Sequence, residues 1–320
     1  MLNIKELIIK PFGRKHIKCI VNKQTNNMNK MLKHKVNTPS PRGGKGVGLV
    51  LFTLISFFTL HSSLFISEAM AQCPVENTAF QSGERLDYKL YFNWKFIWKT
   101  AGSASMTTQA TTFQGKPAFQ TDLITRTAKM ADRFFQMRDT LRSIYTNDMV
   151  PRFYRKGARE GGKYRVNEIS YKYQGGQVKL HQYYRHGDGR IDQVDNTATG
   201  CVYDMVSMVM RCRSYKASDF TVGQRVPFQF ADGGAIKTEH LIYRGIKNFK
   251  VEDTNTTYRC LVFSYMERNS KGKEKEIVTF YITDDNNHIP VRLDLNLRFG
   301  SAKAFLTNAT GLRHASTSIE

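Results

Sequence analysis

The most regular feature of the chain is an alternation of apolar and polar side chains with a period of two. Between residues 84 and 92, Leu86, Tyr88, Leu90 and Phe92 fall on one face, and polar or charged residues lie between them. This pattern is typical of a β-strand with one buried face. Similar segments, several of them bounded by glycine pairs or other turn residues, predict further strands near residues 102–112, 117–127, 137–146, 150–158, 164–173, 177–185, 225–230, 235–244, 258–267, 278–282, 291–298 and 301–307.

One mid-chain segment has a different period. Apolar residues recur at helical spacing over residues 202–213, with Asp204 in the first turn and Arg211 and Arg213 in the last. Acidic residues at the start of a helix and basic residues at its end interact favourably with the helix dipole. We therefore predict a buried helix near residues 202–213, and we expect a shorter helical turn near residues 128–135.

Short strands, polar turns and the lack of strand–helix–strand spacing indicate a mainly β fold. We expect a strongly curved antiparallel sheet, built as a partly open barrel or as two packed sheets, with the helix covering its apolar face. No long linker or internal repeat divides the chain after residue 71. The expected organisation is a basic N-terminal extension and signal peptide over residues 1–71, followed by a single β-rich domain over residues 72–320.

The N-terminal region has the three parts of a secretory signal peptide. An apolar stretch over residues 47–66 follows basic residues and precedes the small-residue sequence that ends at Ala71. We expect cleavage between Ala71 and Gln72, an exported protein in the periplasm or at the outer membrane, and no transmembrane span in the mature chain. The alternatives are an uncleaved membrane anchor and lipid attachment at Cys73.

The formal net charge of +21 suggests an acidic partner, but the leader carries much of that charge. Up to Ala71 there are 11 basic and two acidic residues, so the mature chain keeps 37 basic and 25 acidic residues, a net charge of +12. An exported protein is not expected to bind nucleic acid. The remaining basic residues could attract anionic lipid or an acidic glycan, or could simply be solvated. They are densest at Arg126, Arg133, Arg138, Arg142, Arg152, Arg155, Lys156, Arg159, Lys163 and Arg165.

Four cysteines follow the expected cleavage site, an even number that suits an oxidising compartment. Cys73, Cys201, Cys212 and Cys260 are therefore candidates for disulfides. A helix over residues 202–213 would hold Cys201 and Cys212 roughly 16 Å apart, too far for a disulfide, so Cys73 or Cys260 would be the partner of either. The alternative is a set of buried free thiols, since a chain of this length can form a core without disulfides.

The order of several short motifs resembles a known family. In chain order the motifs are Phe80, Gly83, Glu84, Leu86 and Tyr88; Ala101 and Gly102; Tyr203, Asp204, Ser207 and Arg213; Asp284, Pro290 and Val291; and Gly300, Ala304 and Leu306. Over residues 80–310 their order and spacing resemble the domain-of-unknown-function family 3108, a group of exported bacterial envelope proteins. The resemblance implies an extracytoplasmic, mostly β protein, and it assigns no catalytic residue.

The sequence contains none of the common catalytic or metal-binding motifs, such as H-E-x-x-H, G-x-S-x-G, C-x-x-C or a nucleotide-binding glycine loop. We therefore expect no enzymatic activity, no cofactor and no metal site. The segment Asp284, Asp285, Asn286 and Asn287 is interpreted as a turn rather than as a calcium site. In the alternative, a hydrolase of an envelope polymer, the acids would be Glu84 with Asp87, or Asp204 with a distant partner.

Two groups of residues are candidates for ligand binding. Trp94 and Trp98, just after the first strand, could stack on sugar rings or lie among lipid head groups, or else belong to the core. Asp204, Ser207 and Arg213 could line a pocket beside the helix, although apolar stripes at helical spacing more often serve packing. We expect non-catalytic binding of an amphiphilic lipid, an anionic glycan or an envelope protein; a structural assembly factor is a further alternative to the hydrolase.

Overall fold

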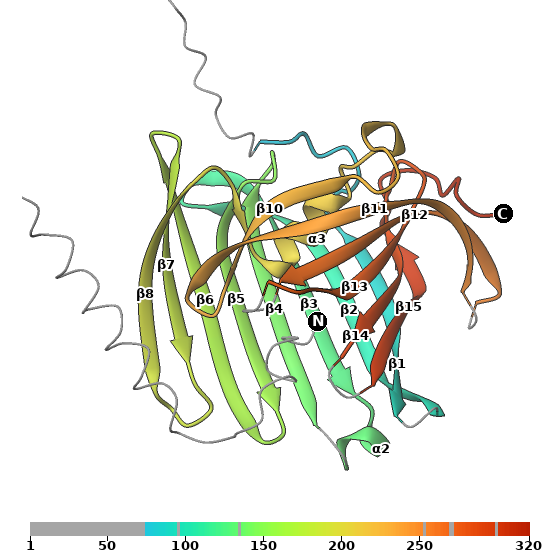
Figure 1. Cartoon of the computed structure of the whole chain (residues 1–320), viewed down its shortest axis with the longest axis horizontal. Helices are drawn as coiled ribbons and strands as arrows, with labels where there is room; N and C mark the ends of the chain where they lie inside the picture. The colour runs from blue at the N-terminus through green and yellow to red at the C-terminus, as the bar shows by residue number, and fades with distance from the viewer. Residues whose placement is uncertain (1–73, 95–96, 134–135, 252–253, 269–271, 298–299) are drawn as a thin grey trace, which may run out of the picture. The chain divides into compact units, whose positions relative to one another are not determined.

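The computed structural model describes residues 74–94, 97–133, 136–251, 254–268, 272–297 and 300–320 (Figure 1). These residues form one large β-sheet with two short helices, α2 (Lys129–Asp132) and α3 (Met205–Cys212), and a 3-10 turn at Ala217–Asp219. The strands are β1 (Glu84–Trp94), β2 (Ile97–Phe113), β3 (Lys116–Thr127), β4 (Met137–Thr146), β5 (Pro151–Glu160), β6 (Lys163–Gln174), β7 (Gln177–Arg185), β8 (Ile191–Thr199), β9 (Val202–Tyr203), β10 (Arg225–Asp232), β11 (Ala235–Val251), β12 (Thr256–Arg268), β13 (Glu274–Thr283), β14 (Pro290–Asn296) and β15 (Ser301–Thr310).

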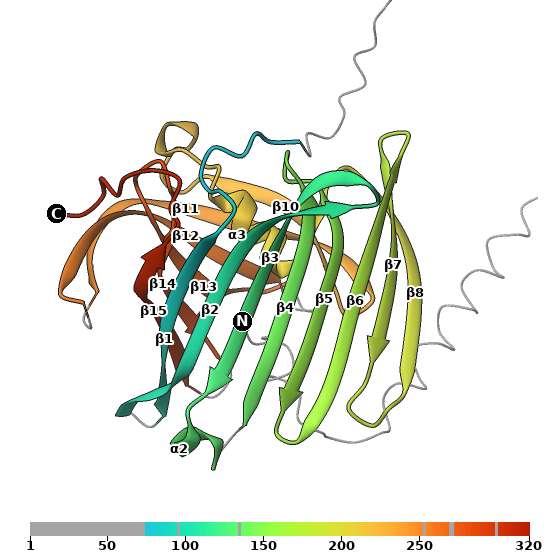
Figure 2. The ribbon, with the colours of Figure 1, turned by 180° about the vertical axis from the view of Figure 1, so that it is seen from behind.

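The sheet is an up-and-down meander that curves into a nearly closed barrel (Figure 1 and Figure 2). Strands β1 to β8 lie side by side in chain order, as do β9 to β15, and β1 pairs with β15 to join the two halves. Strands that follow one another in the sequence thus become neighbours in the sheet, which is the arrangement that short connections favour. The prediction of a mainly β protein with a strongly curved, partly open sheet is confirmed.

The sheet is interrupted between β8 and β9. These two strands end the ladder on either side, and β9 pairs in parallel with β10. The Gln229 side-chain amide donates to the Thr199 carbonyl oxygen at 2.6 Å, and the Gly234 amide donates to Oε1 of Gln182 at 3.3 Å. Side-chain contacts therefore hold these edges together where the described strands form no continuous ladder.

Helix α3 packs on the inner face of the sheet, against β4 (Figure 1). Its side chains Val206 and Met210 are buried in the main apolar cluster, so the predicted buried helix is confirmed. The helix begins later than predicted, because Asp204 has extended backbone and caps it, while Val202 and Tyr203 form β9. Apolar residues at these positions suit either a short strand or a first helical turn, so periodicity alone did not separate the two.

Alternation along the strands separates an inner from an outer face. Along β4 the odd-numbered positions from Met137 to Tyr145 are buried, and the even-numbered positions between them are partly or fully exposed. The inward apolar side chains, among them Leu86, Leu141 and Ile169, form one cluster with the helix. Removing this apolar surface from water is the main stabilising contribution to such a fold.

The expectations for the N-terminus fall outside the described residues. The signal peptide, its cleavage site between Ala71 and Gln72, and Cys73 all precede Pro74, where the description begins. Within the described chain, neither helix has the length and apolar character needed to cross a bilayer.

Candidate functional site

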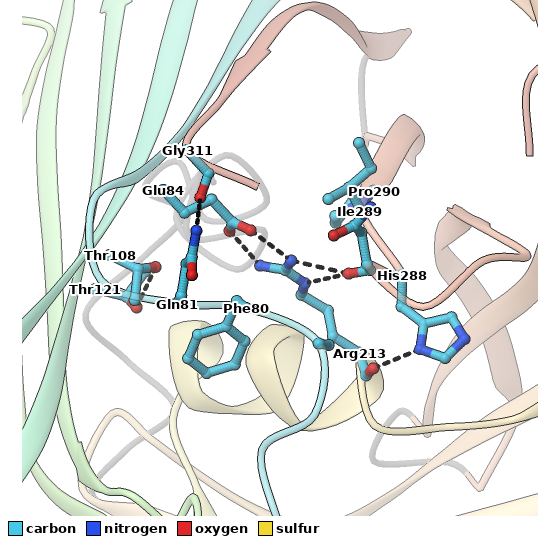
Figure 3. A network of polar contacts seen from close by, with 12 residues as sticks. Phe80, Gln81, Glu84, Thr108, Thr121, Arg213, His288, Ile289, Pro290 and Gly311 are labelled. Atoms are coloured by element: carbon cyan, nitrogen blue, oxygen red, sulfur yellow. Dashed lines mark hydrogen bonds and ion pairs between the residues drawn. The ribbon is translucent and has the colours of Figure 1, made fainter. Parts of the chain in front are cut away.

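A buried ion pair between Glu84 and Arg213 joins the start of β1 to the end of α3 (Figure 3). The guanidinium donates to the two carboxylate oxygens of Glu84 at 2.5 and 2.8 Å and to the carbonyl oxygen of Asn287 at 2.9 Å. The side chains of Arg213 and Glu84 are 0% and 1% exposed, and the guanidinium also lies 5.1 Å from the centre of the Phe80 ring. Such a pair is costly to break, because the remaining charge would stay buried without its partner.

The loop that contains Asn287 also fastens the C-terminal tail. The Asn287 side chain exchanges hydrogen bonds with the backbone of His314, and Asp285 accepts a hydrogen bond from the Ser318 hydroxyl. Asp285 also accepts hydrogen bonds from the backbone amides of Asn287 and His288, which closes the connection between β13 and β14. The oxygens of Asp285 are thus used inside the protein, which confirms the interpretation of this segment as a turn.

Asp204 and Ser207 form a capping box at the start of α3. Oδ1 of Asp204 accepts hydrogen bonds from the amides of Val206 and Ser207, each at 2.9 Å, and Oδ2 accepts from the hydroxyls of Ser143 and Ser207 at 2.9 and 2.8 Å. Burial raises the pKa of Asp204 to about 6, although these hydrogen bonds to the carboxylate oppose the shift.

The structure places the predicted ligand residues in different surroundings. Asp204, Ser207 and Arg213 are buried, and their polar groups bond to the protein itself. The backbones of Trp94 and Trp98 belong to β1 and β2, and their side chains lie outside the described set. The residues brought together here stabilise the fold and leave no unoccupied acceptor on Asp204 for a ligand.

The acids considered for a hydrolase do not share a cleft. Glu84 points inward to Arg213, whereas Asp87 lies on the outer face and pairs with Arg85. Asp204 is fully buried as the N-cap of α3. Glycoside hydrolysis requires two carboxyl groups on either side of one bond, and these acids are not arranged in that way.

The cysteines have different states. Cys212 and Cys260 are buried free thiols, which corrects the prediction that they could join disulfides. Burial raises the pKa of each thiol to about 12, so both stay protonated and act as small apolar groups. Cys201 is not among these free thiols.

Much of the predicted basic face is paired with acidic residues. Arg138, Arg142 and Arg155 form ion pairs with neighbouring carboxylates at 2.6, 2.7 and 2.7 Å. Lys156, which the sequence grouped with them, is buried on the inner face of the sheet. Arg138, Arg142 and Arg155 thus lie on the outer face with local partners, whereas Lys156 of the same sequence run faces inward.

This inward lysine belongs to a group of polar residues on the inner face of β3 to β6. The group combines hydroxyl, amide, carboxylate, ammonium and guanidinium side chains at positions where the alternation turns the side chain inward. We name it the inner-wall cluster, and its members are Thr125, Asp139, Lys156, Glu160, Arg165 and Asn167.

Strand register arranges the cluster in rows. Lys156 lies between Leu141 and Asn167 in the row nearer to α3. Asp139 and Arg165 lie one row further from the helix, and each is opposite Ala158 of β5. Ser143, two residues after Leu141 on β4, donates a hydrogen bond to the helix cap Asp204, and this contact shows toward which end of the strand α3 lies.

Three atoms of the inner-wall cluster have no hydrogen-bond partner among the described residues: Oγ1 of Thr125, Nζ of Lys156 and Oδ1 of Asn167. These residues are only 4%, 6% and 7% exposed. Nζ of Lys156 lies 3.9 Å from Glu160, beyond hydrogen-bond distance, and Arg165 reaches the other oxygen of Glu160 at 3.2 Å. A buried polar atom without a partner costs about 1–3 kcal/mol, so such atoms usually bond to water or to a ligand.

The pattern of the sequence did not reveal this cluster. Charged residues occupy both faces of β5, where Arg155 and Arg159 point outward and Lys156 and Glu160 point inward. Lys156 and Glu160 lie two and six residues after the apolar Tyr154, so strand alternation places all three side chains on the same face. This spacing was the sequence signal that could have predicted their inward position.

The described residues include no group of three or more histidine, cysteine, aspartate or glutamate side chains arranged to hold a metal ion. His181 and His186 pair with Asp195 and Asp192 at 2.8 and 2.6 Å. The inner-wall cluster offers charged and hydrogen-bonding side chains beside apolar residues of the same wall.

A family model of proteins of unknown function, DUF3108, matches residues 87–307. The chain belongs to this family. The match extends from β1 to β15 and confirms the resemblance found in the motifs. No curated protein matches this DUF3108 chain.

Two solved structures are similar to the DUF3108 chain at low identity. One is a β-barrel-like protein of the DUF1849 family from Brucella abortus, with 10% identity, a TM-score of 0.44, and coverage of 76% of this chain and 100% of that chain. The other, from Bacteroides fragilis, is described as an exported protein with a YmcC-like fold; it has 8% identity, a TM-score of 0.32, and coverage of 74% and 100%. Likenesses at this level assign no ligand and no activity to the chain.

Proposed function

We propose that this DUF3108 protein is an exported cell-envelope protein that binds an amphiphile, without catalysis, against the inner face of its sheet. The observation that carries the proposal is the inner-wall cluster, in which Thr125, Lys156 and Asn167 each bury a polar atom without a hydrogen-bond partner among the described residues. A polar ligand group could satisfy these atoms and offset the cost of their burial.

The surroundings of the cluster support an amphiphile over a wholly polar ligand. Lys156 lies opposite Leu141, which in turn pairs with Leu123, and Ile169 lies in the next row toward α3. Ligand sites in proteins are mostly apolar with a few placed polar groups, which is the composition of this wall. In the proposed complex the apolar part of the ligand lies toward α3 and its head group lies on the inner-wall cluster.

Export is supported by the sequence upstream of the domain. The apolar stretch over residues 47–66 and the small residues before Gln72 have the form of a signal peptide. Cell fractionation and the mass of the N-terminal peptide test this part of the proposal. Export predicts envelope protein that begins at Gln72, whereas protein in the cytoplasm with residues 47–66 intact would contradict it.

Native mass spectrometry of the protein purified from envelope membranes tests ligand binding. We expect the wild type to carry an added mass that extraction identifies as an amphiphile. Lys156→Met should lose most of this mass, because the ammonium group can no longer hold the head group. Arg155→Met is the matched control, since Arg155 is the adjacent residue, faces outward and is paired with Glu168.

The controls also define failure. Arg155→Met should retain the ligand as the wild type does. If the wild type carries no amphiphile and takes up none from mixed-lipid vesicles, the proposed function is wrong. If Lys156→Met and the wild type retain the same amount, the ligand does not lie on the inner-wall cluster.

A further inference from the structure

The inner-wall cluster carries charges of both signs on one small area of sheet. Asp139 and Glu160 are acidic and Lys156 and Arg165 are basic, and they come from the adjacent strands β4, β5 and β6. We propose that the head group bound here is zwitterionic, with an anionic phosphate and a primary ammonium, the chemistry of a phosphatidylethanolamine. The inference rests on the proposed function, since it names the class of amphiphile for the same site.

The balance of charge argues against the simpler head groups. An anionic head group would come close to the Asp139 and Glu160 carboxylates in a setting that screens repulsion poorly. A head group with only a positive charge would meet Lys156 and Arg165 in the same way. A neutral sugar would have no charge of its own with which to distinguish the acidic from the basic groups.

The order of the charges along the wall matches the order of groups in a phospholipid. Lys156 lies in the row nearer to the apolar residues beneath α3. Asp139 lies one row further away, in the row of Arg165, whose guanidinium is paired with Glu160 at 3.2 Å. Successive rows on one face of a strand are separated by two residues, or roughly 7 Å. In a phospholipid the phosphate lies next to the acyl chains and the ammonium lies beyond it. The phosphate would therefore meet Lys156, and the ammonium would donate hydrogen bonds to Asp139.

The neutral members of the cluster fit the same assignment. Asn167 lies directly opposite Lys156, and Thr125 directly opposite Asp139. The Thr125 hydroxyl can donate to a phosphate oxygen or accept from an ammonium, and Oδ1 of Asn167 can accept from an ammonium. Both atoms can therefore bond to the ammonium half of a zwitterionic head group.

Calorimetric titration of the purified protein with short-chain lipids tests the inference. The probes are dihexanoyl phosphatidylethanolamine, dihexanoyl phosphatidylglycerol and the chain-free head group glycerophosphoethanolamine. We expect the ethanolamine lipid to bind about tenfold more tightly than the glycerol lipid, a difference of about 1.4 kcal/mol. The chain-free head group should bind at least tenfold more weakly than the ethanolamine lipid, because the apolar wall contributes to affinity.

Variants separate the two halves of the head group. Asp139→Asn should reduce the affinity for the ethanolamine lipid to that for the glycerol lipid, while Lys156→Met should weaken both. Asp122→Asn is the matched control, because Asp122 lies on the outer face of β3, paired with Arg142. Circular dichroism confirms that each variant is folded, and the wild-type preference between the two lipids stands as a test without any variant.

Three results would overturn the inference. Equal affinity of the wild type for the ethanolamine and the glycerol lipid would mean that the protein does not distinguish head groups by their charge. This result would leave the proposed binding of an amphiphile intact. Equal affinity for the chain-free head group and the lipid would make the ligand a small zwitterion from solution. Binding of neither lipid would remove the proposed function together with this inference.

Discussion

Replacing Arg213 with methionine should destabilise the protein far more than replacing an arginine on its surface. The change leaves the Glu84 carboxylate, which is 1% exposed, without its two charged hydrogen bonds. It also removes the donor to the Asn287 carbonyl oxygen and the contact with the Phe80 ring. Removing one partner of a buried ion pair typically costs about 3–5 kcal/mol, because the other charge stays buried and uncompensated.

Urea unfolding followed by circular dichroism measures this loss as a change in the free energy of unfolding. For a domain of this size, about 3–5 kcal/mol corresponds to a fall in the melting temperature of roughly 6–20 °C. The matched control is Arg142→Met, which breaks the ion pair between Arg142 and Asp122, where the arginine side chain is 45% exposed. Exposed pairs of this kind contribute less than about 1 kcal/mol.

A double variant separates the charge from the packing. Adding Glu84→Gln to Arg213→Met removes the uncompensated carboxylate, so it should recover about 1–3 kcal/mol of the loss. The reasoning is refuted if Arg213→Met destabilises the protein no more than Arg142→Met does. It is also refuted if adding Glu84→Gln deepens the loss, because the uncompensated charge would then not be its source.

Three further predictions concern other parts of the fold. Because burial raises the pKa of Asp204 from 3.8 to about 6, the stabilisation linked to its protonation is complete below about pH 4 and is lost as the pH rises through 6. In urea unfolding between these pH values, the free energy of unfolding of Asp204→Asn should change with pH by about 3 kcal/mol less than that of the wild type. An equal change in the two proteins would contradict this prediction. Gly102→Ala would place a Cβ atom 2.0 Å from a backbone carbonyl oxygen of β3, so thermal unfolding should reveal a loss of about 1–3 kcal/mol, and an unchanged melting temperature would contradict the close approach. Since the other described cysteines are free thiols, non-reducing peptide mapping of the exported protein should find Cys201 joined to Cys73; a free thiol at both would disprove the pairing.

The strands could be predicted where alternation is a property of the local sequence. The ranges predicted for β4 and β7, residues 137–146 and 177–185, agree with the structure at both ends. β8 was missed because its sequence has no regular alternation, and Ile191 and Val194 on it are exposed. Pairing with β7 makes this segment a strand, and a partner strand is not visible in the pattern of one segment.

The candidate site could be predicted only in part. Asp204, Ser207 and Arg213 stood out in the sequence, but their roles as helix cap and ion-pair partner depend on residues elsewhere in the chain. Lys156 looked like one of many basic residues, because charged side chains occupy both faces of β5 and the parity that it shares with Tyr154 is a weak signal beside them. Its significance depends on the strands beside it and on its burial.

By itself, the sequence determined that this protein would be mainly β, with most of its strands in their places and one buried helix at mid-chain. Those properties follow from local periodicity, since side chains alternate along a strand and recur every three to four residues along a helix. The tertiary structure alone decided that the sheet nearly closes on itself, that Arg213 meets Glu84 across 129 residues, and that charges of both signs gather on one inner wall. These depend on how distant strands come to lie side by side, and the curvature and register that bring them together are settled by the whole sheet.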